Sequence, residues 1–363
     1  MTIRFASTLL GLIRGWKLSS SQNDFGLSAV ERVSAKERNR SIDVAKGILI
    51  LTVVVGHSGS FFSNYLYWFH MPAFFMISGF LFKKCERWNS ARDYLVRKIQ
   101  SYAILYLSYF VLLTLVRLLY TDASSFTLSK VLVKLFVGGR FVGMELGTFW
   151  FVTCLAISLI AFTMIQTFVR RRAYQLLILT GLYCLAHGEA YLQNKRGMAF
   201  YIPWNMDVAL LAVCYVAIGF YSQQWLLRLM RDRRLRVIWL FASFATGALM
   251  IALDVRGAIH YRLDMNNVNY THLAGDLFIP TVFALFILLG STFIEEVPIA
   301  AVFRWFGCFS IVIMFLHPAV LCIYRHYFSY NWIAFSIVAS VLPLVIGFVL
   351  HQSPVTRKLF IKG

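Results

Sequence analysis

Long apolar runs alternate with short polar or basic segments along nearly the whole chain. A run of roughly 17 to 25 mainly apolar residues is long enough for a helix to cross the hydrocarbon core of a bilayer. Runs of about this length occupy residues 42–60, 65–82, 101–120, 149–169, 173–188, 206–223, 237–254, 275–294, 306–325 and 331–350. The pattern predicts an all-α fold, a polytopic membrane helix bundle of about ten transmembrane helices.

Composition agrees with this prediction and excludes a soluble domain. Of the 363 residues, 59% are hydrophobic and only 14% are charged, whereas about 25% of the residues of ordinary soluble proteins are charged. The formal net charge of +19 does not indicate a nucleic-acid partner, because the basic residues are concentrated in alternate connections. If the N-terminus is cytoplasmic, the segments on its side of the membrane hold 25 of the 35 Lys and Arg residues. Cytoplasmic loops carry such an excess, so we expect both termini in the cytoplasm.

Three regions are expected along the chain. Residues 1–40 form a basic cytoplasmic segment, in which FASTLLGLI at residues 5–13 is typical of an interfacial helix. Residues 41–350 form the membrane domain, and residues 351–363 form a cytoplasmic tail. The basic surface on this side is expected to attract anionic membrane lipids.

The first apolar run, SIDVAKGILILTVVVGHSGSFF, contains three ionisable side chains that are costly in hydrocarbon. Lys46 and His57 are three helical turns apart, which places them on one stripe and separates them by about 16 Å along the helix axis. Asp43 lies one turn before Lys46 and can neutralise it. Two interpretations follow: Asp43 and Lys46 reach the interface while His57 packs in the bundle, or the stripe is part of a functional site.

Two further histidines lie in or beside apolar runs. His70 enters the second run from the same side of the membrane as His57, where it could belong either to an aromatic belt or to a site. His317 precedes Pro318, and a proline there leaves the carbonyl of Met314 without its helical partner. His317 therefore stabilises a kink or belongs to a functional site.

The connection before the fourth run ends in a glycine-rich stretch that holds two charged residues of interest. Arg140 and Glu145, in GGRFVGMELGTFWFVTCL, either bind an anionic or hydroxylated ligand or lie in a solvated loop. The sequence contains no recognisable metal motif, P-loop, nucleophile elbow or dinucleotide fingerprint, so no metal is predicted.

Four stretches in order resemble the acyltransferase family 3 membrane proteins. They are SIDVAKGILILTVVVGHS, FHMPAFFMISGFLF, GTFWFVTCLA and FRWFGCFSIVIMFLHPAV. The family is marked by a basic residue, ten intervening residues and a histidine in the first span, here Lys46-x10-His57, although many members have arginine at the first position. Two other stretches, DVALLAVCYVAIGFY and HLAGDLFIPTVFALFILLGST, resemble the branch grouped with fucose 4-O-acetylases.

The resemblance implies a multi-pass protein of the bacterial cytoplasmic (inner) membrane, with residues 41–350 as the acyltransferase domain. It also implies transfer of an acyl group, usually acetyl from acetyl-CoA, to a sugar hydroxyl of a cell-surface glycan or glycolipid precursor. His57 is then the catalytic candidate, acting as a general base or carrying the acyl group, with His317 and His70 as its helpers. Two further sets of residues are expected in the site. We expect the donor to be bound by Lys46, Asp43, Lys83 and Lys84. We expect the acceptor and the oxyanion to be bound by Ser78, Arg140, Glu145 and Trp150.

Two readings outside the enzyme class remain open. A secondary transporter would use the intramembrane His, Lys and Asp residues as a proton or substrate relay. A non-catalytic partner of a glycan export machine would use the same bundle only for assembly.

Overall fold

The computed structural model describes residues 29–85, 87–117, 128–139, 146–198, 200, 202–270 and 272–361. The chain divides into two compact units, Met1–Asn39 and Arg40–Gly363, and the second contains the helix bundle. The interfacial helix predicted at residues 5–13 lies outside the described residues, as do Arg140 and Glu145.

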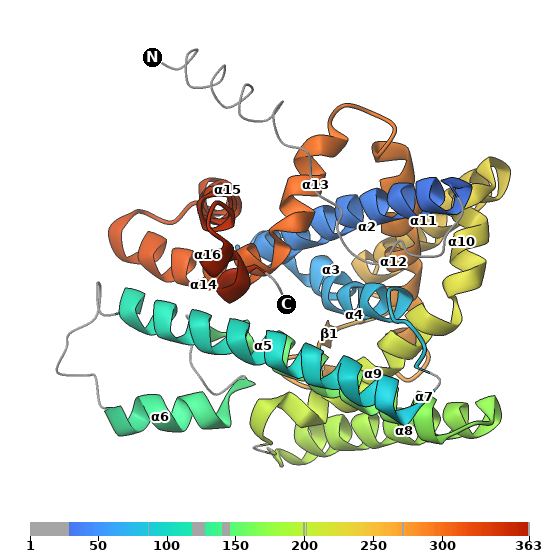
Figure 1. The fold of residues 1–363 in the computed structure, drawn as a ribbon, viewed down its shortest axis with the longest axis horizontal. Coiled ribbons are helices and arrows are strands. Elements are labelled where there is room, and N and C mark those ends of the chain that lie inside the picture. The colour runs from blue at the N-terminus through green and yellow to red at the C-terminus, as the bar shows by residue number, and fades with distance from the viewer. Residues whose placement is uncertain are drawn as a thin grey trace. The chain divides into compact units, whose positions relative to one another are not determined.

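Helices make up most of the described chain (Figure 1). In order they are α2 (Ala29–Gly56), α3 (Ser63–Tyr67), α4 (His70–Phe80), α5 (Trp88–Arg117), α6 (Leu128–Val137), α7 (Phe149–Phe168), α8 (Arg172–Arg196), the 3-10 turn η4 (Pro203–Asn205), α9 (Met206–Tyr221), α10 (Gln223–Arg231), α11 (Arg233–Val255), α12 (Gly275–Ile294), α13 (Ala300–Cys308), α14 (Ser310–Tyr327), α15 (Trp332–His351) and α16 (Pro354–Phe360).

Among the described residues, seven helices are long and apolar enough to cross a membrane. They are α5, α7, α9 with its preceding turn, α11, α12, α14 and α15. This confirms an all-α membrane bundle. The other three predicted spans coincide with α2, with α4 and with α8, so a total of about ten spans, and the side on which the termini lie, remain predictions.

Two predicted spans are each divided into two helices. The run at 65–82 contains α3 and α4, which are separated by Trp68 and Phe69. Pro72 explains the new start, because it falls in the first turn of α4, where a missing backbone N–H breaks no helical hydrogen bond. The run at 306–325 is likewise divided at Phe309, between α13 and α14.

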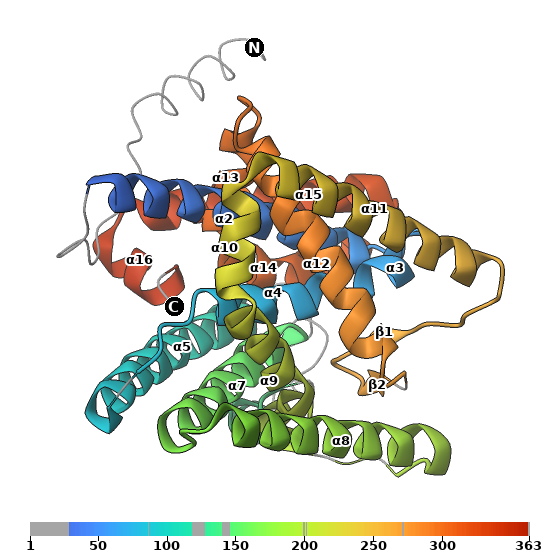
Figure 2. The same ribbon diagram turned by 90° about the vertical axis from the view of Figure 1, so that its right-hand side faces the viewer.

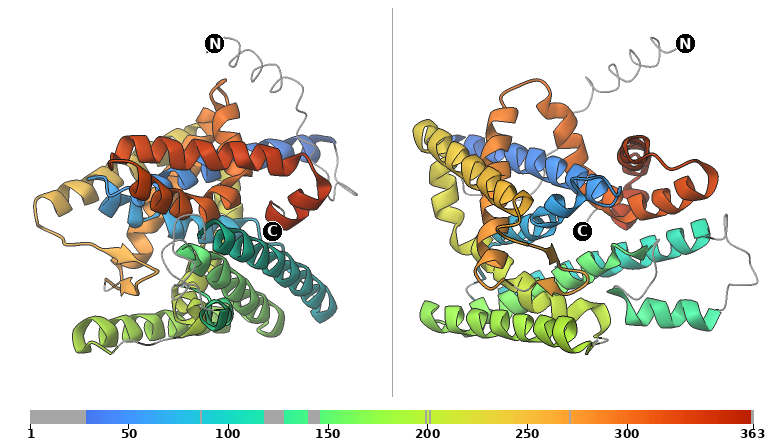
Figure 3. Two further views of the ribbon diagram at one scale, coloured as in Figure 1. Left: turned by 90° about the vertical axis from the view of Figure 1, so that its left-hand side faces the viewer. Right: turned by 180° about the vertical axis from the view of Figure 1, so that it is seen from behind.

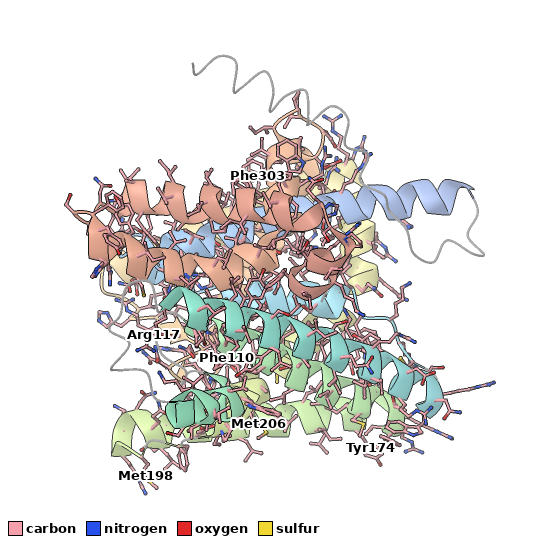
Figure 4. The ribbon with its side chains drawn as sticks, turned by 60° about the vertical axis from the view of Figure 1, so that its left-hand side comes forward. Phe110, Arg117, Tyr174, Met198, Met206 and Phe303 are labelled. Atoms are coloured by element: carbon pink, nitrogen blue, oxygen red, sulfur yellow. The ribbon has the colours of Figure 1, made fainter. Side chains whose placement is uncertain are left out.

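Glycines set two close helix crossings that position the ends of α2 and α4. Where α4 crosses α9, a Cβ at Gly79 would overlap the carbonyl of Val216, and a Cβ at Gly219 would overlap the carbonyl of Met76. The contact between α2 and α13 is also reciprocal: a side chain at Gly47 would overlap the carbonyl of Phe303 (labelled in Figure 4), and one at Gly307 that of Asp43. Both crossings bring backbones together as small residues do in membrane helix pairs.

The C-terminal helix folds back onto the bundle (Figure 3). The phenol of Tyr109 in α5 donates a hydrogen bond of 2.9 Å to the carbonyl of Phe360 in α16, and the rings of these two residues meet edge to face. The segment predicted as a tail therefore contains a helix that packs against α5.

A short β-hairpin, which the apolar pattern did not predict, lies between α12 and α8 (Figure 2). Its strands, β1 (Leu263–Asp264) and β2 (Asn269–Tyr270), pair antiparallel. Helix α8 extends below it from Tyr174 near its start to Met198 just past its end, both labelled in Figure 4.

Candidate functional site

His57 lies one residue beyond the end of α2, at the tip of the first long apolar helix. Its backbone N–H still donates to the carbonyl of Val53, at 3.1 Å, so the residue continues the last helical turn. Its Nδ1 lies 3.0 Å from the phenol oxygen of Tyr67 on α3. A hydrogen bond to the second ring nitrogen fixes how an imidazole is oriented and which of its nitrogens carries the proton.

His317 lies behind His57 on α14. The two ring centroids are 5.1 Å apart. Nδ1 of His317 is 2.9 Å from the carbonyl of Ile313, and because a carbonyl only accepts, Nδ1 carries the proton. In the neutral ring Nε2 then holds a lone pair, and this fully buried atom has no hydrogen-bond partner among the described residues. This side-chain hydrogen bond goes to the carbonyl of Ile313, one residue before the Met314 carbonyl that Pro318 leaves without its helical partner, and the structure also places His317 against His57.

His70 occupies the first position of α4, and its ring centroid is 5.0 Å from that of Tyr67. Gly56 makes room for it, because a Cβ at that position would lie 3.2 Å from Cε1 of His70. The side chain is 1% exposed, and its Nδ1 has no hydrogen-bond partner among the described residues. Three imidazoles and one phenol therefore meet where α2, α3, α4 and α14 converge.

A cavity of about 400 Å³ opens beside this cluster. Small-molecule sites in proteins are commonly about 300 to 1,000 Å³. The lining comes from the end of α2 (Val53, His57), from α3 and α4 (Tyr67, His70, Met71), from the start of α7 (Gly147, Thr148, Trp150), from the β-hairpin (Asp264, Met265, Asn266, Asn267) and from α14 (Met314, Pro318, Leu321). Segments far apart in the sequence thus form one apolar chamber with several polar groups.

The start of α7 contributes a buried hydroxyl and an aromatic ring to the cavity. Thr148 is 3% exposed and occupies the N-cap position of α7, yet its side chain makes no capping hydrogen bond. Its Oγ1 has no hydrogen-bond partner among the described residues. Trp150, predicted as an acceptor-side residue, is 6% exposed and lines the same cavity.

The β-hairpin supplies a carboxylate that sequence reasoning missed. Asp264 lines the cavity with His57 and Tyr67, and its charge acts electrostatically on both. The signal that could have identified it is the alternation in YRLDMNNVNY, where apolar and polar residues follow each other as they do in a half-buried strand. The hairpin is too short for that pattern to stand out.

Lys46 forms an ion pair within α2. Its Nζ lies 2.7 Å from Oδ1 of Asp43, as the spacing of one helical turn predicts, and both side chains are partly exposed. Neither residue is among those that line the His57 cavity. The helix is unbroken from Lys46 through Gly56, so α2 carries Lys46 and ends one residue before His57.

Lys83 and Lys84 lie in the exposed connection between α4 and α5. Lys84 lines a separate cavity of about 460 Å³, together with Cys85, Trp88, Gln166, Thr167, Phe168, Arg170 and Gln175. This second cavity shares no lining residue with the His57 cavity. The structure therefore does not bring Lys84 next to His57.

Ser78 is also placed away from the site. Its hydroxyl donates to the carbonyl of Phe74, one turn earlier in α4, at 2.9 Å, and it is not among the residues that line the His57 cavity. Of the sequence-predicted residues that the structure describes, His57, His70 and Trp150 line the cavity, and His317 supports it from behind.

Comparison with known proteins identifies the family of the chain. No curated protein matches the chain at a significant level. A family model described as an acyltransferase domain, Acyl_transf_3, matches residues 39–352, which include α2 from residue 39 onward, all of α3 to α15 and every residue that lines the cavity. The chain belongs to this family of membrane acyltransferases, acyltransferase family 3.

Proposed function

We propose that the protein is an O-acyltransferase that moves acetyl from acetyl-CoA to a sugar hydroxyl of a cell-surface polysaccharide, lipopolysaccharide or lipid-linked glycan precursor. One observation carries the proposal. His57 faces a cavity of about 400 Å³ while its Nδ1 is held 3.0 Å from the Tyr67 phenol, which is the arrangement of a base oriented by a second group.

The proposed reaction uses His57 as the general base. With Nδ1–H donating to the Tyr67 oxygen, the Nε2 lone pair is free to take the proton of the acceptor hydroxyl. The hydroxyl oxygen attacks the thioester carbonyl, and the tetrahedral intermediate collapses with loss of the CoA thiolate. The thiolate then takes the proton from Nε2, which returns the imidazole to its starting state.

Three neighbouring side chains are suited to support this step. The Thr148 hydroxyl is a buried donor without a protein partner among the described residues, and we assign it to the developing oxyanion in place of Ser78. His317 and His70 are positioning residues that pack around the reacting imidazole and its phenol partner.

The donor is proposed to enter from the cytoplasmic side, where CoA is found. Lys46 lies about three helical turns from His57, or about 16 Å along the axis, and Asp43 lies one turn further away. The distance from Lys46 is within the reach of an extended pantetheine arm. Lys46 would meet the CoA phosphates there. In this proposal Lys83 and Lys84 contribute only to the positive electrostatic potential of the cytoplasmic face.

The setting follows from the same proposal. We place the protein in the bacterial inner membrane as a multi-pass protein with cytoplasmic termini, in contact with anionic lipids. We assign it to the branch of the family that resembles fucose 4-O-acetylases. The hairpin and the His57 cavity lie toward the outer face, where the glycan acceptor is modified.

The decisive experiment uses purified full-length protein, radiolabelled acetyl-CoA and a lipid-linked glycan extract. We expect label to appear in the glycan with the wild-type protein and to fall at least a hundredfold with His57→Ala, since a general base contributes about 10²- to 10⁴-fold. His326→Ala is the matched control, because His326 lies near the end of α14 and is not among the cavity-lining residues. Equal transfer by the wild-type protein and His57→Ala would contradict the assignment.

Two rival readings give different results in the same experiment. A stable acetyl group on His57, detected by mass spectrometry before acceptor is added, would identify an acyl-imidazole mechanism. Substrate flux into proteoliposomes without acyl transfer would identify a transporter, a reading that membership of an acyltransferase family does not favour.

A further inference from the structure

The β-hairpin contributes one wall to the cavity that His57 and His70 also line. Asp264, Met265, Asn266 and Asn267 all line the space that His57 and Trp150 also line. These four residues include one carboxylate and two carboxamides, which are concentrated in a short connection of an otherwise apolar chain. The wall thus presents hydrogen-bonding groups where most of the remaining lining is apolar.

The hairpin is anchored by an alternating set of buried side chains. Leu263 is 2% exposed and Met265 is 3% exposed, whereas Asp264 between them is only partly buried. Tyr261 and Tyr270 are also buried at the base of the hairpin. This period of two holds the apolar side chains in the protein, so the polar side chains keep fixed positions at the cavity.

Helix α8 holds the tip of the hairpin from outside. The side chain of Gln193 donates to the carbonyl of Asn267 at 2.9 Å, and the side chain of Asn194 donates to the carbonyl of Val268 at 3.2 Å. Both contacts use backbone acceptors of the hairpin, so they hold its tip without using the side chains of Asn267 and Val268.

A buried polar pair fixes the chain that leaves the hairpin. Nε2 of His187 in α8 lies 3.0 Å from Oδ2 of Asp276 at the start of α12, and the backbone N–H of His272 donates to the same oxygen at 2.9 Å. The phenol of Tyr183 donates to the carbonyl of Leu273. The wall is therefore clamped at its tip and at its exit, which favours a preformed binding surface over a loop that orders around its ligand.

The Asp264 carboxylate is oriented and still has hydrogen-bonding capacity. Its Oδ1 accepts the backbone N–H of Asn267 at 3.3 Å, and its Oδ2 accepts the side-chain amide of Asn267 at 2.7 Å. A carboxylate offers about four lone-pair sites, so about two remain for a ligand that donates. Vicinal hydroxyl groups supply such donors, and Trp150, which lines the same cavity, supplies apolar surface for the less polar side of a sugar or other polyol.

We propose that the hairpin Leu263–Tyr270 is the acceptor-recognition wall of this enzyme and that Asp264, with Asn267, binds a hydroxyl next to the one that is acylated. This inference rests on the proposed function for its place in the reaction. It assigns the choice of acceptor to a segment distinct from the histidine cluster. The acceptor class is a polyhydroxylated ring with at least two neighbouring hydroxyl groups.

The first test measures binding without turnover. Full-length protein in detergent is mixed with methyl α-L-fucopyranoside, methyl β-D-glucopyranoside and methyl α-D-mannopyranoside, and contacts are detected by saturation-transfer difference NMR. We expect at least one glycoside to give signals with the wild-type protein that fall at least fivefold with Asp264→Asn and with Asn267→Ala. Asp93→Asn is the matched control, since Asp93 is an exposed residue of α5 outside the cavity.

The second test measures how acetyl-CoA is divided between sugar and water. The ratio of glycoside acetylation to hydrolysis should fall at least tenfold with Asp264→Asn and stay within twofold with Asp93→Asn. Circular dichroism and gel-filtration profiles of all variants show whether each protein is folded. Replacement of His57 instead removes both products.

The outcomes separate the two proposals. Glycoside binding that depends on Asp264 in a protein that transfers no acetyl group would support the hairpin assignment and reject the acyltransfer chemistry. Glycoside binding or a product ratio that is the same in the wild-type protein and in folded Asp264→Asn would overturn the hairpin assignment. Absence of binding to every glycoside by the wild-type protein would overturn it as well.

Discussion

Nδ1 of His57, one residue beyond the end of α2, and the phenol oxygen of Tyr67, the last residue of α3, lie 3.0 Å apart. A phenol can donate to an imidazole nitrogen or accept from one. In the proposed reaction Nδ1–H of His57 donates to Tyr67, and the Nε2 lone pair then accepts the proton. A histidine held in this way needs little reorganisation when the acceptor arrives.

Removal of the Tyr67 hydroxyl should slow the chemical step without unfolding the protein. We expect Tyr67→Phe to lower kcat about fivefold, because loss of one orienting hydrogen bond is worth about 1 kcal/mol. Tyr65→Phe is the control, since Tyr65 lies on the same short helix but does not line the cavity. Steady-state acetyl transfer measures both, and a kcat of Tyr67→Phe equal to that of the wild-type protein would reject the orienting role.

The Thr148 hydroxyl should stabilise negative charge in the transition state. Thr148→Val keeps the shape of the side chain and removes the donor, so we expect kcat to fall about a hundredfold. Thr148→Ser restores a hydroxyl and should recover most of the rate. Equal rates for the valine and serine variants would show that the hydroxyl takes no part in the reaction.

The α4–α9 crossing should tolerate no side chain at its contact point. Gly79→Ala places a Cβ against the carbonyl of Val216, and we expect a lower melting temperature, consistent with an overpacking cost of about 1 to 3 kcal/mol. Gly181→Ala is the matched control, because a Cβ at that helical position in α8 meets nothing within 4 Å. Thermal unfolding in one detergent compares the two, and equal melting temperatures would contradict the close-packing argument.

Lys46 should act on donor affinity and leave acceptor affinity alone. Lys46→Gln removes the cation, and we expect acetyl-CoA to bind about tenfold more weakly, as loss of one charged hydrogen bond implies. Lys46→Arg keeps the charge and should stay near wild type. Because Lys46→Gln also leaves Asp43 without its partner, the double variant with Asp43→Asn is measured alongside. If that double variant binds acetyl-CoA as tightly as wild type, Lys46 has no direct role in donor binding.

The proposed topology can be checked with two engineered cysteines. Asn89 at the start of α5 and Asn269 in the hairpin are both exposed, and the six native cysteines are first replaced by serine or alanine. We expect a membrane-impermeant maleimide to label Asn269→Cys in intact cells and Asn89→Cys only after permeabilisation. The reverse pattern would place the His57 cavity on the donor side of the membrane.

Much of the bundle was predictable because helix formation in a membrane is a local matter. The apolar runs at 149–169, 275–294 and 331–350 match α7, α12 and α15 almost residue for residue, since each must satisfy its backbone hydrogen bonds internally. The divisions at Trp68–Phe69 and at Phe309 were not predicted. An apolar stretch looks the same whether its helix is continuous or broken, and only packing shows the break.

The candidate site was predicted in part for the same reason. His57 and Lys46 belong to one apolar run, so their spacing alone predicted that they lie on one stripe of a helix, three turns apart. Ser78 was assigned to the oxyanion from its motif, but its hydroxyl is used within α4. Thr148 and Asp264 were missed because neither is unusual in its own segment.

The sequence by itself determined that this is a helical membrane protein of a recognisable acyltransferase type with a histidine at the end of its first long apolar helix. Those properties depend on run length, residue type and spacing along one helix. The tertiary structure alone decided that Tyr67, Thr148 and Asp264 meet that histidine. They come from α3, from the start of α7 and from the hairpin, and their meeting depends on how the surrounding helices cross. In the α4–α9 and α2–α13 crossings, the approach is set by glycine backbones in direct contact, a relationship between distant segments that no local pattern records.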